Sequence, residues 1–255
     1  MKTMRFSGKT AVVTGAAGGM GREIAKAFAS ESGNVALIDI NQSGLQELKE
    51  SLSEYPVKVE VYNCNIMDYD TVQEFGKKIL ADFGSIEILV NNAGGGKPGQ
   101  NLSILDEDRE TWEFIIALNL SSAYYCIKAF VPQMVEKNYG KVVNISSVAG
   151  VRGGGLIAKG SYAVAKSGIL GLTKILAREV GPNGVNVNAI APGLHLTPST
   201  AATPLTEHKR IIDNLPLRQS GNPKHLAQLV AFLASDDAPF ITGSVITADG
   251  GYSMH

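Results

Sequence analysis

The sequence predicts a doubly wound α/β fold: a seven-stranded parallel sheet with helices on both faces, in a single domain. First, seven short apolar segments alternate with longer segments of helical periodicity. Second, the short segments are almost continuously apolar, as expected for parallel strands buried on both faces. Third, the 255 residues contain no internal repeat, low-complexity segment or linker, which favours one domain over residues 1–255.

The expected strands contain the segments TAVVTG, NVALIDI, VKVEVYNC, IEILVNNAG, GKVVNISS, VNVNAIAPG and SVITADGG. They occupy residues 10–15, 34–40, 57–64, 86–94, 140–147, 185–193 and 244–251. The helix after the third strand has apolar residues at helical spacing and an Asp68 or Asp70 cap; its apolar positions are Val72, Phe75, Ile79 and Phe83. Further helices are expected at 22–30, 112–136, 162–180 and 224–235.

Residues 194–214 form a proline-interrupted segment with weak periodicity. A segment of this length without its own pattern is unusual in a compact domain and is commonly functional. We therefore predict a substrate lid there, with the rest of the chain forming one dinucleotide-binding and catalytic domain.

Composition excludes several classes of function. The chain has 23 basic and 24 acidic residues, with no basic stripe, so a nucleic-acid partner is not expected. No apolar run approaches membrane-spanning length, and no apolar region precedes the glycine loop as in a signal peptide, so a cytoplasmic enzyme is expected. Cys64 and Cys126 form no CxxC pair; they suit a reducing compartment, although a disulfide between them stays open. The four histidines lack metal-ligand spacing, so no metal is expected.

A glycine-rich stretch, TGAAGGMGREIA at 14–25, lies directly after the first strand and opens a helix. Gly15, Gly19 and Gly21 would allow a tight turn and let backbone N–H groups approach a pyrophosphate at the helix N-terminus. A flexible turn has the same composition, but the strand–turn–helix context favours dinucleotide binding.

The second strand ends in Asp39, 18 residues after Gly21. A carboxylate there can accept hydrogen bonds from both hydroxyls of an adenosine ribose and would repel a 2′-phosphate. The alternative is a turn residue that caps the next helix. Two more strands end in polar segments, NNAG at 91–94 and NISS at 144–147, and ligands of such sheets bind beyond the carboxyl ends of strands. Turn hydrogen bonding would also explain the serines.

Tyr162 and Lys166 lie four residues apart in GSYAVAKSG and would share one helix face. A nearby ammonium lowers the pKa of a phenol from its usual ~10, and such a tyrosine can exchange protons near neutral pH. The same spacing also occurs by chance on ordinary helix surfaces, so the pair acquires weight only from the other motifs.

Taken together, the motifs resemble those of the short-chain dehydrogenase/reductase family, whose fold is Rossmann-like, over essentially the whole chain. The matching segments are TGAAGGMG at 14–21, NNAG at 91–94, Asn119 in ALNLSSA, NISS at 144–147, Tyr162-x-x-x-Lys166, APG at 191–193 with Thr197, and the closing ITGSVITADGG. The branch of 3-oxoacyl-carrier-protein reductases and bacterial secondary-alcohol dehydrogenases is the most similar.

The resemblance implies a role for each matching residue. Tyr162 would be the acid/base, and Lys166 would lower its pKa and bind the nicotinamide ribose. Ser147 would polarise the substrate oxygen, and Asn119 would help hold a water of the proton relay. The implied cofactor contacts are Gly15, Gly18, Gly19, Met20, Gly21, Asp39, Ile40, Asn65, Ile66, Asn92, Ala93, Gly94, Tyr162, Lys166, Pro192, Gly193, Leu194 and Thr197.

Departures from the family pattern bear on the cofactor. Asn65–Ile66 stands where an Asp–Val pair is frequent, and positions that hold a basic residue in phosphate-preferring relatives hold Gly18 and Ile40. We therefore expect NAD rather than NADP, and an NAD-dependent oxidoreductase acting on a secondary alcohol or its ketone. The alternatives are an NADPH-dependent 3-oxoacyl-thioester reductase and a catalytically silent nucleotide-binding regulator. The apolar surface of the helices at about 112–136 and 162–180, together with the family resemblance, favours a homotetramer.

The substrate stays open among steroids, polyols, cyclic alcohols and hydroxyacyl thioesters. Charged residues flank the expected pocket and could bind a carboxylate or phosphate, although solvated loop charges are the simpler interpretation; they are Lys97, Arg152, Lys159, His195 and His208.

Overall fold

A single seven-stranded parallel sheet organises the computed structural model, which describes residues 4–96, 103–155, 158–198, 200 and 204–254. The strand order is β3-β2-β1-β4-β5-β6-β7, and every pairing is parallel. The strands are β1 (Thr10–Thr14), β2 (Asn34–Asp39), β3 (Val59–Asn63), β4 (Ile88–Asn91), β5 (Gly140–Ile145), β6 (Val185–Pro192) and β7 (Val245–Ala248). The predicted doubly wound, seven-stranded fold is confirmed.

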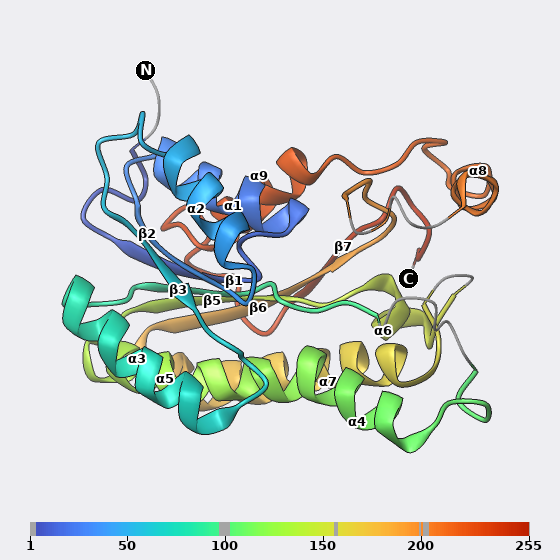
Figure 1. Ribbon diagram of the computed structural model, residues 1–255, viewed down its shortest axis with the longest axis horizontal. Coiled ribbons are helices and arrows are strands. Elements are labelled where there is room, and N and C mark those ends of the chain that lie inside the picture. Colours follow the sequence, from blue (N-terminus) through green and yellow to red (C-terminus); the bar gives the residue numbers. More distant parts are fainter. Residues whose placement is uncertain (1–3, 97–102, 156–157, 199, 201–203, 255) are drawn as a thin grey trace.

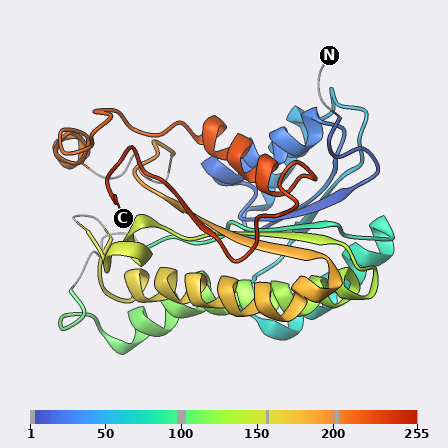
Figure 2. The ribbon, with the colours of Figure 1, turned by 180° about the vertical axis from the view of Figure 1, so that it is seen from behind.

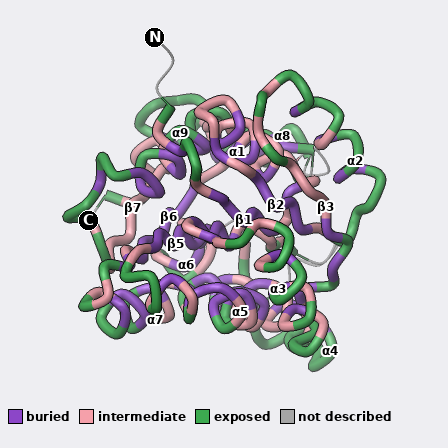
Figure 3. The backbone as a smooth tube through the Cα atoms, turned by 90° about the vertical axis from the view of Figure 1, so that its left-hand side faces the viewer, coloured by how far each residue is buried: buried purple, intermediate pink, exposed green. Residues whose placement is uncertain are grey.

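Helices cover both faces of the sheet (Figures 1 and 2). One layer contains α1 (Gly19–Ser30), α2 (Gln42–Ser51) and α9 (Pro223–Leu233); the other contains α3 (Tyr69–Phe83), α4 (Arg109–Ile116), α5 (Ser122–Glu136) and α7 (Gly160–Val180). Each layer closes its own apolar core against the sheet, one around Phe28 and Leu45, the other around Ile79 and Phe130. The central strands between them are largely buried, whereas the edge strands β3 and β7 are mostly of intermediate exposure (Figure 3).

The remaining elements are short. They are the π-helical turn η1 (Ala117–Ser121), α6 (Val148–Arg152), the 3-10 turn η2 (Gly181–Asn183) and α8 (Leu205–Ile212). In the chain, η1 comes after β4 and α4, and α6 comes directly after β5. Both lie near the carboxyl ends of these strands. The predicted lid contains α8, and part of that segment lies outside the described residues.

Several boundaries differ from the sequence expectation. Helix α1 begins at Gly19 rather than Arg22, because the glycine loop itself supplies the first helical turn. Helix α2 was expected without bounds, only as the helix that Asp39 would cap in the alternative interpretation. Its cap is instead Asn41, whose side chain accepts from the Gly44 N–H, and Leu45 and Leu48 face the core. Of the two possible caps for α3, Asp68 is the one that accepts the backbone N–H.

Residues Arg109–Glu136 correct the expectation that no apolar segment reaches membrane-spanning length. Together they form a 28-residue helix that is long and apolar enough by length and composition. However, α5 packs against α3, β4, β5 and α7, and Phe130 and Met134 are fully buried in the core. Its apolar character therefore reflects its place in the helical layer.

Candidate active site

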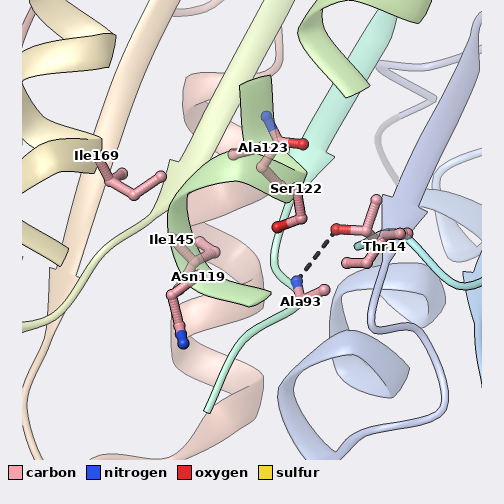
Figure 4. A pocket seen from close by; sticks show the side chains of 9 residues that line it. Thr14, Ala93, Asn119, Ser122, Ala123, Ile145 and Ile169 are labelled. Atoms are coloured by element: carbon pink, nitrogen blue, oxygen red, sulfur yellow. Dashed lines mark hydrogen bonds between the residues drawn. The ribbon is translucent and has the colours of Figure 1, made fainter. Parts of the chain in front are cut away.

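The glycine loop and the end of β4 are tied together at the carboxyl edge of the sheet. Thr14 Oγ1 accepts hydrogen bonds from the backbone N–H groups of Asn92 and Ala93, both at 3.1 Å (the second is drawn in Figure 4). The Asn92 Nδ2 group donates to the carbonyls of Thr14 and Gly15 at 2.9 and 3.1 Å. The predicted cofactor residues Asn92 and Ala93 thus hold the loop in place through the protein's own hydrogen bonds.

Two loop glycines are required sterically. Gly15 has φ +64°, and a Cβ there would lie 2.8 Å from the Ala93 Cα. A Cβ at Gly21 would lie 2.1 Å from the Gly15 carbonyl oxygen. The loop therefore folds back tightly on the first turn of α1.

The N-terminus of α1 is free of a side-chain cap. Gly18 occupies the N-cap position and cannot supply one. The N–H groups of the first turn therefore keep their capacity to bind an anion. A Cβ at Gly19 would lie 2.9 Å from the Thr197 Cβ, which places Thr197 directly over the loop, as the cofactor prediction requires. Met20 is partly buried and packs against the core.

Asp39 closes the far side of the same loop. Its Oδ2 accepts from the Ala17 N–H at 3.0 Å and its Oδ1 from the Asn41 N–H at 2.9 Å. A carboxylate has about four lone-pair sites, so both oxygens can accept one further hydrogen bond. The next side chain, Ile40, is 70% exposed and carries no charge.

The guanidinium of Arg22 is committed to protein groups. It donates from Nε to the Ala17 carbonyl at 3.0 Å, and from Nη2 to the Gly44 carbonyl and to the Glu47 carboxylate at 3.0 and 2.9 Å. This charge is therefore already balanced by Glu47 beside the loop, and it offers little compensation to a 2′-phosphate.

The two residues after β3 have different surroundings. Asn65 Oδ1 accepts from the Met67 N–H at 3.1 Å, which closes an Asx turn. Ile66 is buried and lines a small enclosed pocket with Thr14, Ala93 and Asn119, the last three of which are labelled in Figure 4. Ile66 thus acts as packing behind the cleft, and the structure gives the Asn65 amide a turn-forming role.

Asn119 sits in the π-helical turn η1 between α4 and α5 and is 1% exposed. Its Nδ2 donates to the carbonyls of Ile115 and Gly95, and its Oδ1 accepts from the Gly95 N–H at 2.9 Å. The extra residue of a π-turn re-aims a side chain locally, and such turns are frequent at functional sites. Here it directs the amide at the segment that follows β4.

Lys166 meets Asn119 across Gly94. A Cβ on Gly94 would lie 2.6 Å from the Asn119 Oδ1 and 3.0 Å from the Lys166 Nζ, so only glycine lets both approach this backbone. Lys166 is 2% exposed, and its ammonium donates to the Ile145 carbonyl at 2.9 Å. Burial lowers its pKa from 10.5 to about 8.

Tyr162 lies beside Lys166, whose Nζ is 5.8 Å from the centre of the phenol ring. Burial raises the pKa of Tyr162, and a hydrogen bond with Ser147 partly opposes that rise. The net pKa of Tyr162 is therefore raised where a lowered value was expected, because burial outweighs the neighbouring groups; that the Lys166 ammonium favours the phenolate stays a prediction. The chance-surface alternative is wrong for Lys166, which is buried.

Ser147 serves two purposes at the end of β5. Its Oγ accepts from the Ala149 N–H at 3.1 Å and caps α6, and it also hydrogen-bonds Tyr162. Ser146 donates from Oγ to the Lys166 carbonyl at 2.7 Å, and this contact fixes β5 against α7. The turn role and the functional role of this motif therefore coexist.

Glu107 is a residue that the sequence reasoning missed. Its carboxylate accepts from the Ser161 N–H at 2.9 Å and from the Ser161 Oγ at 2.7 Å. It thereby supplies the N-terminal cap of α7 one residue before Tyr162, since Lys159 provides no side-chain cap. The two partners are 54 residues apart, and no local pattern signals the contact.

The segment after β6 is built around a packed histidine. His195 is 7% exposed, its Nδ1 lies 3.1 Å from the Gly193 carbonyl oxygen, and burial lowers its pKa. A Cβ at Gly221 would lie 2.3 Å from the His195 Nε2, and the Gly221 N–H donates to the Leu194 carbonyl. His195 therefore helps to hold this loop together, and it also lines a surface pocket with Leu194 and Asp249. Pro192 is the last residue of β6.

The other charged residues that were expected to flank the pocket have different surroundings in the structure. Lys159 is exposed and Lys97 lies outside the described residues. His208 belongs to α8 and is buried, and its Nε2 has no hydrogen-bond partner among the described atoms. Arg152 faces a pocket described below. Cys64 and Cys126 are both buried free thiols, which resolves the disulfide question.

Comparison with known proteins gives consistent matches over nearly the whole chain. Residues 15–253 match a family model described as enoyl-(acyl carrier protein) reductase. The 3-oxoacyl-(acyl-carrier-protein) reductase FabG of Thermotoga maritima is 36% identical over 248 residues, covering 97% of this chain and 99% of that protein.

Two solved structures extend the similarity to the fold. A 3-oxoacyl-(acyl-carrier protein) reductase of Brucella melitensis with bound NAD has a TM-score of 0.90 at 31% identity, covering 99% of this chain and 94% of the other. Levodione reductase has a TM-score of 0.90 at 30% identity, covering 97% and 98%. The relatives thus act on different ketones, and the similarity does not fix the substrate.

Proposed function

The chain belongs to the short-chain dehydrogenase/reductase family, and from this premise we propose that it is an NAD-preferring oxidoreductase that interconverts a secondary alcohol and its ketone. The observation that carries the proposal is the juxtaposition of Ser147, Tyr162 and the buried ammonium of Lys166. These groups can polarise a carbonyl, deliver a proton to it and stabilise the phenolate that remains.

The proton chemistry follows from the site. A raised pKa keeps Tyr162 protonated at neutral pH, so in the reductive direction its hydroxyl is ready to donate to the substrate oxygen. Ser147 already hydrogen-bonds this hydroxyl and can share the substrate oxygen with it. Lys166, with a pKa of about 8, is still mainly charged at pH 7 and stabilises the phenolate. In the oxidative direction the proton returns along the same path.

The residues present fit a nicotinamide dinucleotide. The uncapped first turn of α1 and the tight loop at Gly15 and Gly21 form a cradle that side chains would fill. Asp39 retains lone pairs for ribose hydroxyls, and Gly94 leaves open the backbone beside Lys166. When bound, the nicotinamide supplies or accepts the hydride.

The preference for NAD is supported by charge. The 2′-phosphate of NADP would place about −1.5 to −2 charges near Asp39. Ile40 is uncharged, and Arg22 is paired with Glu47. The similarity to 3-oxoacyl-thioester reductases supports a second candidate, the reduction of a 3-oxoacyl thioester at the same site.

Steady-state kinetics test the proposal. Wild-type kcat/KM should be at least ~10-fold higher with NAD(H) than with NADP(H), since ~1.4 kcal/mol of repulsion suffices for that ratio. Tyr162→Phe should lower kcat by ~10²–10⁴-fold while NAD binding persists, because only the transferable proton is lost. Tyr124→Phe, on the exposed surface of α5, is the matched control. A Tyr162→Phe enzyme with near-normal kcat would contradict the mechanism.

A further inference from the structure

A second polar feature lies at the substrate end of the molecule. Residues of α6, of α8 and of the C-terminal end of the chain line one pocket there, at the end of the molecule where Figure 1 labels α6, α8 and C. It is a surface pocket of about 360 Å³, lined by Arg152, Ile211, Asn214, Pro216, Gly251, Tyr252 and Met254. Apart from one amide, a phenol and a guanidinium, its described lining is apolar.

The guanidinium of Arg152 is held in a defined place in this pocket. It lies over the Tyr252 ring, 4.2 Å from the ring centre, and its Nη1 donates to the Tyr252 carbonyl at 2.5 Å. An arginine has five N–H donors in a planar fork, and this single contact leaves Nε and Nη2 able to bind a carboxylate through two parallel bonds.

The platform under Arg152 is itself built from polar contacts. Asp249 accepts from the Gly251 N–H at 3.0 Å and from the N–H and Oγ of Ser253 at 2.8 and 2.6 Å. These bonds hold the turn that carries Tyr252. They also occupy both Asp249 oxygens, so the nearest carboxylate of this segment is engaged in the turn. Arg152 is thus the only charged residue in the described lining.

The pocket lies beside α6, the short helix that begins next to the proposed catalytic serine. Ser147 caps the start of α6, and Arg152 is the last residue of the same helix, ~7.5 Å farther along its axis. The other wall comes from Ile211 of α8 and from Asn214, both in the predicted lid. The pocket and the proposed catalytic serine thus lie at opposite ends of one short helix.

We propose that Arg152 is a specificity-determining residue that binds the carboxylate of the substrate, so that this enzyme acts on hydroxy or oxo acids whose acid group is several carbons from the reacting carbon. This inference rests on the proposed function and narrows its substrate class. It distinguishes a free acid from a carrier-bound thioester, which has no carboxylate at that position. The Tyr252 ring and the apolar lining would contact the intervening carbon chain.

A binding experiment tests the inference independently of turnover. Methyl-ketone acids from 4-oxopentanoate to 8-oxononanoate, and their methyl esters, are titrated calorimetrically into the wild type, Arg152→Gln and Arg152→Lys loaded with oxidised NAD, which has no hydride to transfer to a ketone. Arg178→Gln is the matched control, since Arg178 is exposed near the far end of α7. The longer acids should bind the wild type and the control at least ~10-fold more tightly than their esters, and Arg152→Gln should lose that difference. Arg152→Lys, which keeps the charge but not the fork, should retain part of it.

Kinetics with NADH then complete the test. Arg152→Gln should raise KM for the longer acids at least ~10-fold and change kcat/KM for the esters by less than ~2-fold.

Equal binding of acids and esters by the wild type overturns the inference, as does a variant that weakens both alike. An effect confined to acetoacetyl-coenzyme A also overturns it, because Arg152 would then serve a carrier phosphate. Reduction of the esters alone would overturn the inference and leave the proposed function standing. Acid binding without reduction of any ketone would refute the proposed function, and the inferred substrate class with it.

Discussion

The buried ammonium of Lys166 should make the stability of this protein depend on pH in a specific direction. Burial lowers the pKa of Lys166 from 10.5 to about 8, so folding disfavours its charged form. Below pH 8 the Lys166 side chain is charged in both the folded and the unfolded state, so the folded protein bears the full desolvation cost of the charge. Between pH 8 and 10.5 only the unfolded chain keeps the proton, so stability rises with pH. The gap in pKa corresponds to about 3 kcal/mol, at ~1.36 kcal/mol per pKa unit.

The substitution Lys166→Met isolates this effect, because it removes the charge and approximately keeps the volume. At pH 7, removal of the buried charge should raise the free energy of unfolding of the variant by up to about 3 kcal/mol. Loss of the hydrogen bond to the Ile145 carbonyl should lower it by ~1 kcal/mol. The variant should therefore be as stable as the wild type or more stable, although its turnover is lost. As the pH rises to 10.5, the wild type should gain about 3 kcal/mol relative to the variant.

Urea unfolding of both proteins between pH 7 and 10.5 measures this difference, at one fixed protein concentration so that association contributes equally. All other titrating groups are shared by the two proteins and cancel to first order. A difference that stays constant with pH would show that Lys166 is not desolvated in the folded protein. A wild type that loses stability relative to the variant as pH rises would reverse the sign and refute the reasoning.

Three further predictions concern the cofactor, the catalytic helix and the assembly. The double substitution Asp39→Ala with Ile40→Arg should shift the ratio of kcat/KM toward NADP by at least ~10-fold, since it replaces repulsion by attraction; an unchanged ratio would exclude Asp39 as its origin. Glu107→Gln should lower kcat by roughly tenfold with little change in KM for NAD, because the charge-assisted cap beside Tyr162 is weakened; equal losses in both constants would indicate general misfolding. Light scattering should show about four times the 27.0 kDa chain mass, and a 27 kDa species would contradict the tetramer.

The fold could be predicted because its evidence is local and repeated. The central strands of a doubly wound sheet are buried apolar runs, and these have a similar appearance in the sequence. The helices for which no range was predicted, α2, α6 and α8, show the limit, and α2 is the clearest case. Its first residues look like a turn because Asn41 is both a turn former and a helix cap, and only the following Leu45 and Leu48 reveal the buried face.

The site was predictable to the extent that parallel strands bring their carboxyl ends to one edge. That rule places Thr14, Asn92 and Ser147 together without any knowledge of contacts. It gives no information about burial, and burial is what raises the pKa of Tyr162 where a lowered value was expected. It is equally silent on the contact between Glu107 and Ser161, because the two lie far apart in sequence and neither belongs to a motif.

Three of the proposed catalytic groups are held by hydrogen bonds within the protein. Ser147 accepts from Ala149, Lys166 donates to Ile145, and Asn119 exchanges two hydrogen bonds with Gly95. A structural role for each residue is therefore no argument against a chemical one, because a catalytic group must be oriented before the substrate arrives. The desolvated ammonium has a cost of about 3 kcal/mol, which a site selected for stability alone would not carry. Its retention at the junction of Gly94, Asn119 and Tyr162 is best explained by the proton chemistry that it supports.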